Sequence, residues 1–209
     1  MSEIMVPELY KKYHLDRDCE LCSVFKSLSS HYEINSFLYP GSFAHITPSF
    51  YIPKGVYVDM MLPAKKFFDS PEVLEYIKRR KTYKEAPDVT FHHQSYEEPI
   101  DETELSFDLL ISQYGGFVSE VTKKYLKKGG ILLANDSHGD AGLAFIDPDF
   151  KLIGIFEEQN GIYVLSAKDL DLYFIPKKGG LVSREYLREL RKGVLYTKNA
   201  PNYIFEKVA

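Results

Sequence analysis

The segment "NDSHGDA", residues 135–141, places several reactive side chain types on consecutive positions. His138 could act as a general base with Asp140 orienting its ring, because histidine titrates near neutral pH. Asp136, His138 and Asp140 could instead hold a metal ion, which would suit a metal-assisted hydrolase. A nucleophilic Ser137 has little support, because the G-x-S-x-G elbow of hydrolases is missing. A hydrogen-bonded loop in which His138 caps a helix is the alternative without catalysis.

Apolar strands and amphipathic helices alternate before this segment and must position it. Helices are expected at residues 19–32, 70–81 and 116–126, where apolar residues recur at spacings of three and four. Gly129 and Gly130 are expected to end the third helix. Short apolar strands are expected at residues 36–39, 56–59, 89–91, 107–111 and 131–134.

The pattern changes in the last third of the chain. Asn160 and Gly161 predict a hairpin turn between two strands. A helix with Leu187, Leu190 and Val194 and a last strand at residues 202–208 follow. The whole pattern predicts an α/β fold: a Rossmann-like, doubly wound, mostly parallel sheet with an antiparallel C-terminal strand region.

No shift in composition divides the chain, so we expect a single domain over residues 1–209. Within it we expect an N-terminal helical extension at residues 1–33. A parallel core should follow at residues 34–135, and an antiparallel hairpin, helix and last strand at residues 143–209.

Ligands of open α/β sheets bind beyond the carboxyl ends of the strands, which selects the residues that could line a cleft. Asp59 follows the second strand, where a carboxylate can bind both hydroxyls of a ribose or can simply cap a helix. Gly41 follows the first strand and would allow a ligand to approach the backbone, although one glycine also makes an ordinary turn. The other strand-end candidates are Tyr39, Pro40, Ser42, His92, His93, Gln94, Ser95, Ser112, Gln113 and Tyr114.

The segment "YLKKGGILLANDSHGDA", residues 125–141, resembles the fifth-strand region of class I S-adenosylmethionine-dependent methyltransferases, in which an LKPGG turn precedes an apolar strand. The order of elements is also similar over nearly the whole chain. More narrowly, "LYPGSFAHITPSFYIPKGVYVD" and "FDLLISQYGGFVSE" resemble an uncharacterised bacterial and archaeal branch of methyltransferase-like proteins.

The resemblance implies S-adenosylmethionine as cofactor and assigns a role to each strand end. The turn of Tyr39, Pro40, Gly41 and Ser42 would approach the methionine part, and Asp59 would bind the ribose. Gln94 and Ser95 would flank the adenine. The residues after the fourth strand would face the methyl group and its acceptor, namely Ser112, Gln113 and Tyr114.

The chain departs from the family pattern at two motifs. The acidic-x-Gly-x-Gly turn is replaced by residues 38–43, and Phe43 and His45 stand where small residues are usual. The Asn/Asp-Pro-Pro-aromatic motif of amino-group methyltransferases is replaced by residues 112–115, which argues against methylation of DNA adenine or glutamine. We therefore expect a methyltransferase for a small molecule, with His138 as base and His92 as a competing candidate. The alternative is a non-catalytic module that binds a ligand or a protein.

Composition limits the partners. The chain has a net charge of −4, which argues against a broad nucleic-acid surface. The uncharged stretch at residues 34–53 contains three prolines and is not expected to span a membrane. The N-terminus has no apolar signal core, so we expect a cytoplasmic protein.

Cys19 and Cys22 form one C-x-x-C pair, which suits two small apolar helix residues, a redox pair or half of a zinc site. The oligomeric state is not indicated.

Overall fold

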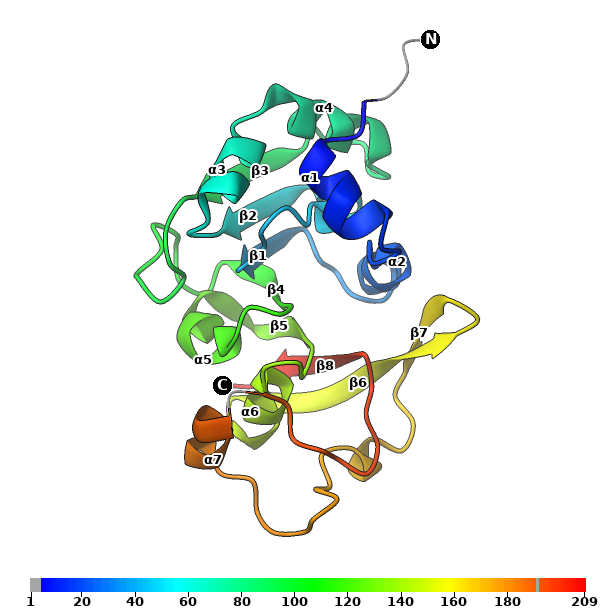
Figure 1. Cartoon of the computed structure of the whole chain (residues 1–209), viewed down its shortest axis with the longest axis vertical. Helices are drawn as coiled ribbons and strands as arrows, with labels where there is room; N and C mark the ends of the chain where they lie inside the picture. Colours follow the sequence, from blue (N-terminus) through cyan, green and yellow to red (C-terminus); the bar gives the residue numbers. More distant parts are fainter. Residues whose placement is uncertain (1–4, 191) are drawn as a thin grey trace. The chain divides into compact units, whose positions relative to one another are not determined.

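The computed structural model describes residues 5–190 and 192–209 of the 209-residue chain. It consists of two compact units, Met1–Ile100 and Asp101–Ala209, each of which combines helices with strands (Figure 1). Parallel strands come first along the chain and antiparallel strands come last, as the hydrophobic pattern predicts. The predicted α/β fold class is therefore confirmed.

Unit 1 is built on three parallel strands in the order β3-β2-β1. Pro40 pairs with Val58, and Val58 pairs with His92, so the three strands end level with one another. The residues that follow these strands consequently share one edge of the sheet. The strands are β1 (Ser36–Pro40), β2 (Lys54–Val58) and β3 (Asp88–His92).

The helices of unit 1 lie around these strands in Figure 1. Ser70 caps the last of them, because its hydroxyl accepts the backbone N–H of Glu72 at 3.4 Å. The connector between β1 and β2 contains a short 3-10 turn and no α-helix. Pro48 and Pro53 explain this, because proline disfavours a helical conformation at the residue before it. The helical elements are α1 (Glu8–Tyr10), the π-helical η1 (Lys11–Leu15), α2 (Cys22–His31), η2 (Thr47–Phe50), α3 (Leu62–Phe68) and α4 (Pro71–Arg80). The sequence pattern did not indicate η1 or α3.

Unit 2 contains five strands in the order β4-β5-β8-β6-β7. Only β4 and β5 are parallel; the other pairs are antiparallel. Asn160 and Gly161 have φ angles of 53° and 78°, and they form the predicted hairpin turn. The strands are β4 (Phe107–Ser112), β5 (Leu126–Ala134), β6 (Phe150–Gln159), β7 (Ile162–Ser166) and β8 (Asn202–Lys207).

The start of β5 differs from the prediction. Gly129 and Gly130 were expected to end a helix, but both lie inside β5, which begins at Leu126. The preceding helix ends earlier, as α5 (Val118–Thr122) and the 3-10 turn η3 (Lys123–Tyr125). Gly129 has a φ of 77°, so a glycine in an irregular strand was mistaken for a helix stop.

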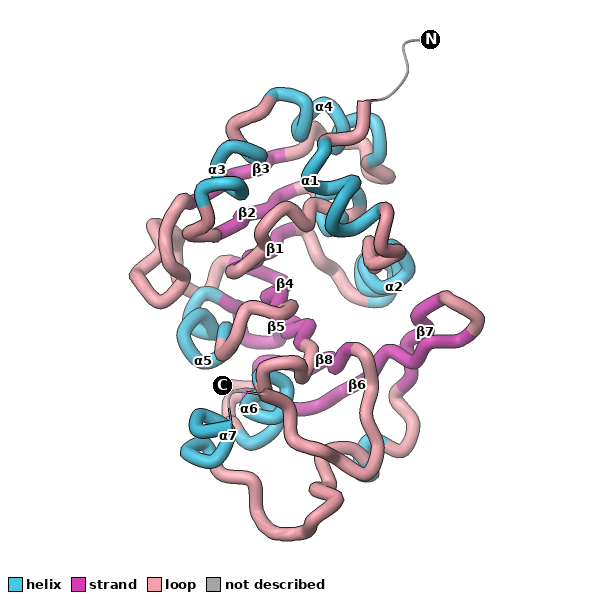
Figure 2. The backbone as a smooth tube through the Cα atoms, viewed as in Figure 1, coloured by secondary structure: helices cyan, strands magenta, loops and turns pink. Residues whose placement is uncertain are grey.

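The remaining helical elements of unit 2 are α6 (Asp140–Ile146), η4 (Leu170–Leu172) and α7 (Arg184–Leu190). The helix predicted after Ser183 is α7, which ends at Leu190. Val194, expected on the same helix, lies in a loop, so this part of the prediction is wrong; residue 191 lies outside the described residues. Figure 2 shows that most of the chain between β7 and β8 is loop.

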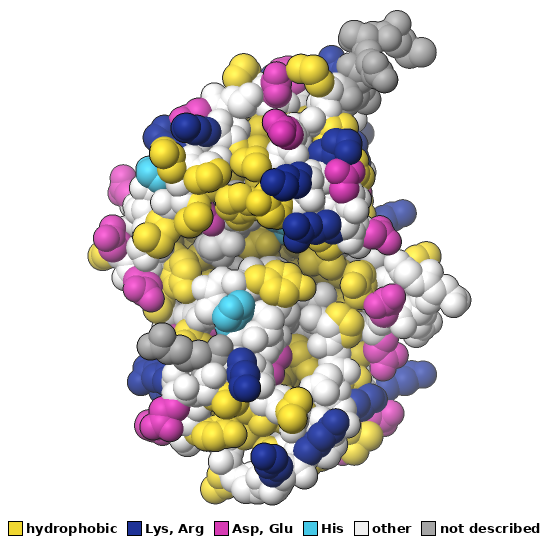
Figure 3. All heavy atoms as spheres, in the orientation of Figure 1, with side chains coloured by type: hydrophobic (Ala, Val, Ile, Leu, Met, Phe, Trp, Pro, Cys, Tyr) yellow, Lys and Arg dark blue, Asp and Glu magenta, His cyan; other side chains and the backbone are white. Residues whose placement is uncertain are grey.

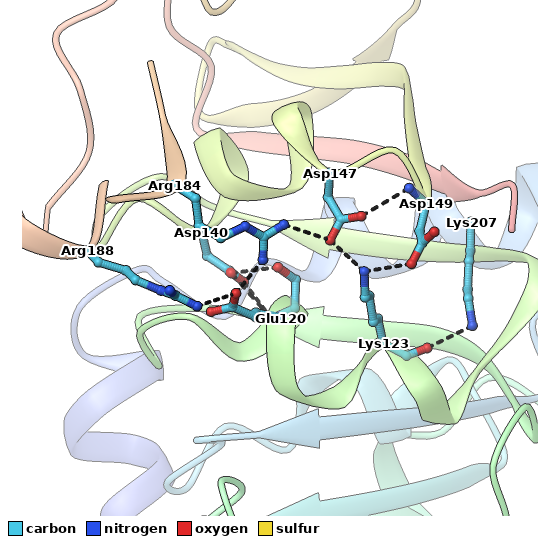
Figure 4. Close-up of polar contacts among 9 residues, drawn as sticks. Glu120, Lys123, Asp140, Asp147, Asp149, Arg184, Arg188 and Lys207 are labelled. Carbon is cyan, nitrogen blue, oxygen red and sulfur yellow. Dashed lines mark hydrogen bonds and ion pairs between the residues drawn. The ribbon is translucent and has the colours of Figure 1, made fainter. Parts of the chain in front are cut away.

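Ion pairs join the helices of unit 2 (Figure 4). Lys123 contacts Asp147 and Asp149, each at 2.6 Å. Glu120 on α5 pairs with Arg184 and Arg188 on α7. This network attaches the short helix α7 to the part of the unit that carries α5 and α6.

On the faces that Figure 3 shows, positive and negative side chains are interspersed in both units. Among the described residues, no helix is long and apolar enough to cross a membrane.

Candidate functional site

The turn after β1 contains two residues with a left-handed backbone conformation. Gly41 has a φ of 65° and donates its N–H to the carbonyl of Val58 at 2.8 Å. Two residues later Phe43 has a φ of 46°, which is unusual for a bulky residue. Left-handed residues at positions 41 and 43 reproduce the spacing of a G-x-G pair.

Asp59 holds this turn in place. One of its carboxylate oxygens accepts the backbone N–H of Phe43 at 2.8 Å, and the other accepts that of Met61 at 2.8 Å. The residue is 7% exposed. Each carboxylate oxygen has a second lone pair, so the predicted ribose contact is compatible with this role and stays a prediction.

Ser42, between the two left-handed residues, has a buried hydroxyl without a hydrogen-bond partner. The residue is 2% exposed, and its Oγ is one of two buried side-chain atoms found without a partner in the described part of the chain. A buried unpaired hydroxyl costs about 1–3 kcal/mol. This is the kind of atom that a bound ligand can satisfy.

His45, which follows the turn, has a structural environment. Its Nδ1 lies 2.9 Å from the Tyr39 hydroxyl, and its Nε2 lies 3.0 Å from the carbonyl of Glu20. Its ring stacks on that of His14 at 4.3 Å. Burial, with a smaller contribution from His14, lowers the pKa of His45 to about 3. The neutral ring therefore ties the turn region to the N-terminal segment.

The other predicted residues of unit 1 lie at the strand ends as expected. Pro40 is the last residue of β1. Gln94 donates to the carbonyl of Pro99 at 3.0 Å, and the Ser95 hydroxyl accepts the N–H of Glu97 at 3.2 Å. Both side chains stabilise their own loop. Their predicted contact with adenine stays a prediction.

In unit 2, Asp140 is fully engaged at the start of α6. Its carboxylate accepts the Ser112 hydroxyl at 2.5 Å, and it accepts both the hydroxyl and the backbone N–H of Ser119. Burial, opposed by these hydrogen bonds and assisted by the charge of Glu120, raises the pKa of Asp140 to about 6. Figure 4 shows Asp140 next to the ion pairs of α5 and α7.

Asp136 is also committed to the backbone. Its Oδ1 accepts the N–H of Gly142 at 2.8 Å. Burial first, then the charge of Asp140, raises the pKa of Asp136 to about 6. Within residues 5–190 and 192–209, no three His, Cys, Asp or Glu side chains are grouped so that they could hold a metal ion. We therefore do not propose the metal-assisted hydrolase.

His138 is exposed, and the hydroxyl of Ser137 lies 3.0 Å from His138 Nδ1. Asp140 was expected to orient His138, but its carboxylate is directed to Ser112 and Ser119 instead. Ser137, Asn135 and the buried Gln113 form a polar set that is joined by side-chain hydrogen bonds. The side chains of Ser112 and Gln113 are thus bonded inside unit 2.

An open cavity of about 430 Å³ lies beside this set. Exposed Tyr114 and buried Asn135 are on its wall, together with Asp136 and Ser137. The loop before β8 provides Asn199, Ala200 and Pro201. The cavity is lined by both apolar and hydrogen-bonding groups, which suits a small polar molecule.

Sequence reasoning did not find several residues of these two regions. Ser119 holds Asp140 across 21 positions, and Asn202 contacts Gln113 across 89. No local pattern signals such distant pairs. The spacing of Gly41 and Phe43 was the one available signal, because position 43 is where the second glycine of a G-x-G pair would stand.

The two cysteines are free and half-buried. Cys22 is the first residue of α2, whereas Cys19 lies in the preceding turn and donates to the carbonyl of Tyr13 at 3.0 Å. Burial raises the pKa of both thiols, which disfavours the reactive thiolate.

Similarity to solved structures defines the fold class. The chain matches a proposed O-methyltransferase from Klebsiella pneumoniae at 11% identity and a TM-score of 0.51, over 76% of this chain and 91% of that one. This likeness shows a methyltransferase-type Rossmann-like fold. No family model matches the chain, and no curated protein sequence matches it.

Two further structures match with lower TM-scores. One is a complex of the Trm112 methyltransferase activator with a proposed methyltransferase from Haloferax volcanii, at 14% identity, a TM-score of 0.47 and 97% coverage of both chains. The other is the YcgJ protein of Bacillus subtilis, at 18% identity and a TM-score of 0.39. That match covers 59% of this chain and about half, 54%, of YcgJ. The fold assignment rests on the Klebsiella structure alone.

Proposed function

We propose that the chain is an S-adenosylmethionine-dependent methyltransferase that acts on a small molecule. The proposal assigns the cofactor to the turn after β1 in unit 1. The observation that carries this proposal is the β1 turn. It combines left-handed Gly41 and Phe43 with the unpartnered hydroxyl of Ser42, on a methyltransferase-type fold.

The residues of the turn fit a ligand of this kind. Gly41 has no side chain that would keep a ligand from its backbone, and Ser42 offers a hydroxyl that needs a partner. Asp59 keeps the turn closed and retains spare lone pairs for ribose hydroxyls. Tyr39, Pro40, Gln94 and Ser95 complete the proposed contacts in unit 1. The cofactor, when bound, supplies an electrophilic methyl group.

The side chains of unit 2 would prepare the acceptor. A hydroxyl or amine acceptor becomes a better nucleophile when a base takes its proton. His138 is the proposed base, because it is exposed and its Nδ1 lies 3.0 Å from the hydroxyl of Ser137, which lines the cavity together with Asn135. The remaining wall would hold the acceptor by apolar contact and hydrogen bonds.

A non-catalytic ligand-binding module is the second candidate. Phe43 fills the place of a glycine, and both oxygens of Asp59 already accept backbone N–H groups. These two features reduce the room and the hydrogen-bonding capacity that the turn offers to a cofactor. The same fold can host binding without catalysis.

Isothermal titration calorimetry with S-adenosylmethionine and S-adenosylhomocysteine tests the proposal. We expect both to bind the full chain, and we expect Ser42→Ala to weaken both about tenfold, the effect of one lost hydrogen bond. Asp59→Ala is a poor first variant because it also releases the N–H groups of Phe43 and Met61.

Ser27→Ala is the matched control, because Ser27 is on α2 and its hydroxyl makes an exposed contact with His31 at 3.4 Å. This variant should bind as the wild type does. If neither compound binds the wild-type chain, the methyltransferase proposal fails. Binding of both, without transfer of a labelled methyl group to any of a panel of hydroxyl and amine acceptors, would favour the non-catalytic module.

A further inference from the structure

A continuous chain of side-chain hydrogen bonds leads from the interior of unit 2 to the exposed His138. Asn202, at the start of β8, accepts from Gln113 Nε2 at 2.8 Å. Gln113, after β4, accepts from Asn135 Nδ2 at 3.0 Å. Asn135, after β5, accepts from the Ser137 hydroxyl at 2.8 Å, and Ser137 Oγ lies 3.0 Å from His138 Nδ1. The three amide residues are 2–6% exposed.

One backbone group sets the direction of every bond in this chain. The N–H of Ser137 can only donate, and it points at Asn135 Oδ1 at 3.2 Å. The oxygen of the Asn135 amide must therefore face Ser137, and its nitrogen must face Gln113. Gln113 then presents its oxygen to Asn135 and its nitrogen to Asn202.

The same reasoning determines which ring nitrogen of His138 carries the proton. Asn135 Oδ1 has no hydrogen, so the single hydroxyl hydrogen of Ser137 is used in that bond. Towards His138 the Ser137 oxygen can only accept. We infer that His138 carries its proton on Nδ1 and presents the lone pair of Nε2 to the acceptor, and that Ser137, Asn135 and Gln113 are positioning residues for this base.

This role deepens the proposed function and rests on it. The ring nitrogen that a histidine uses as a base is set by the hydrogen bond of its other nitrogen. An exposed histidine at a loop needs no defined tautomer for folding, yet buried amides from the ends of three strands are aligned behind this one. With Nδ1 occupied by Ser137, an acceptor hydroxyl or amine would give its proton to Nε2. Its bonding electrons would stay on the oxygen or nitrogen.

The cavity supports the same assignment. Asn135 and Ser137, the two residues that precede His138 in the hydrogen-bond chain, line the 430 Å³ cavity with Tyr114. A small molecule bound there would touch the groups that orient the ring. Substitution of Ser137 or Asn135 should therefore change the tautomer of His138 while the imidazole ring itself stays in place.

Nitrogen-15 NMR of the histidine rings in the ligand-free chain tests the inference. At a pH where the rings are neutral, we expect His138 to show a protonated Nδ1 and an unprotonated Nε2. In Ser137→Ala both resonances should move towards each other, as in a ring that exchanges between tautomers. Asn135→Ala should produce a smaller shift in the same direction, because Ser137 loses its acceptor.

Two other histidines provide internal references. His45 must protonate Nε2, which faces the carbonyl of Glu20, and His31 must protonate Nδ1, which faces the carbonyl of Ser27 at 2.8 Å. Ser27→Ala should leave the rings of His45 and His138 unchanged. Thermal unfolding of each variant shows whether it is folded.

A wild-type His138 with its proton on Nε2, or one that Ser137→Ala does not alter, would overturn the inference. This outcome is independent of the proposed cofactor, because the measurement needs no ligand. Failure of S-adenosylmethionine to bind would remove the methyltransferase proposal and leave the measured tautomer in place.

Discussion

The β1 turn of unit 1 and the strand ends of unit 2 both bury polar side chains, but they satisfy them differently. Ser42 in the turn keeps a hydroxyl without a partner. Asp140, in contrast, accepts three donor groups, and Gln113 and Asn135 are joined in one chain of hydrogen bonds. An unpaired buried group is a cost that a ligand can remove, whereas a paired network keeps its members in fixed positions.

The two regions also hold buried titratable groups of opposite kinds. The turn region buries a neutral histidine, His45, whose pKa is lowered to about 3. The strand ends of unit 2 bury Asp136 and Asp140, whose pKa values are raised to about 6. As the pH falls, protonation linked to His45 should therefore lower the free energy of unfolding, whereas protonation of Asp136 and Asp140 should raise it.

The largest effect is expected from Asp140→Ala. This change leaves the N–H of Ser119 and the hydroxyls of Ser112 and Ser119 without their acceptor in the interior of unit 2. We expect the free energy of unfolding to fall by about 3 kcal/mol in urea titrations. Asp149→Ala, which removes one side of a partly exposed ion pair with Lys123, should cost less than about 1 kcal/mol. Equal losses in the two variants would show that the buried hydrogen bonds of Asp140 contribute no more to stability than a partly exposed ion pair does.

The next effect concerns His45 and pH. The unfolded histidine titrates near 6.5, and the folded one stays neutral until about pH 3, so the unfolded chain binds more protons between these values. Its contribution to stability is present above 6.5 and is lost as the pH falls. Between pH 7 and pH 5, we expect the wild type to lose about 2 kcal/mol of unfolding free energy relative to His45→Gln. A constant difference between the two proteins would contradict a buried neutral His45.

The smaller pH effect has the opposite sign and belongs to Asp140. Its folded pKa of about 6 exceeds the unfolded value of 3.8, so the folded chain binds more protons between them. Its unfavourable contribution therefore shrinks as the pH falls through 6. Between pH 7 and pH 5, the wild type should gain about 1 kcal/mol relative to Asp140→Asn, which cannot ionise. A loss instead of a gain in the same urea titrations would mean that Asp140 is ionised throughout.

The smallest change in stability is expected from Ser42→Ala. Removal of an unpaired hydroxyl leaves no partner behind, so the free energy of unfolding should stay within about 0.5 kcal/mol of the wild type or rise. Ser49→Ala is the control in the same unit, because the Ser49 hydroxyl bonds the buried Tyr57 hydroxyl at 2.6 Å. That variant should lose about 1 kcal/mol. A loss of that size in Ser42→Ala would reveal a structural partner and remove the reason to expect a ligand there.

The fold was largely predictable from local patterns. Short apolar strands between amphipathic helices predicted β1 to β5 within about two residues at most boundaries, and the pair Asn160-Gly161 predicted the β6–β7 hairpin. The main error lay at Gly129 and Gly130, which continue β5 and end no helix. A glycine pair fits a helix end and an irregular strand equally well, and pairing with neighbouring strands decided between them.

The candidate site was predictable in position but not in detail. The rule that ligands bind at strand ends selected Gly41, Asp59, Gln113 and the segment at residues 135–141, and the structure places them all after strands. The partners of these residues could not be derived in this way. Asp140 is bonded to Ser112 and Ser119 and does not contact His138 through its carboxylate.

The sequence by itself determined the alternation of elements, the strand-end positions of the polar residues and the unusual Phe43 in the turn. These features depend on hydrophobic periodicity and on the conformational limits of glycine and proline, which act over a few residues. Only the tertiary structure decided that Ser42 lacks a partner, that Asp59 holds the turn and that buried amides set the ring of His138. Hydrogen bonds between distant residues depend on which strand ends the fold places together, and no local pattern contains that information.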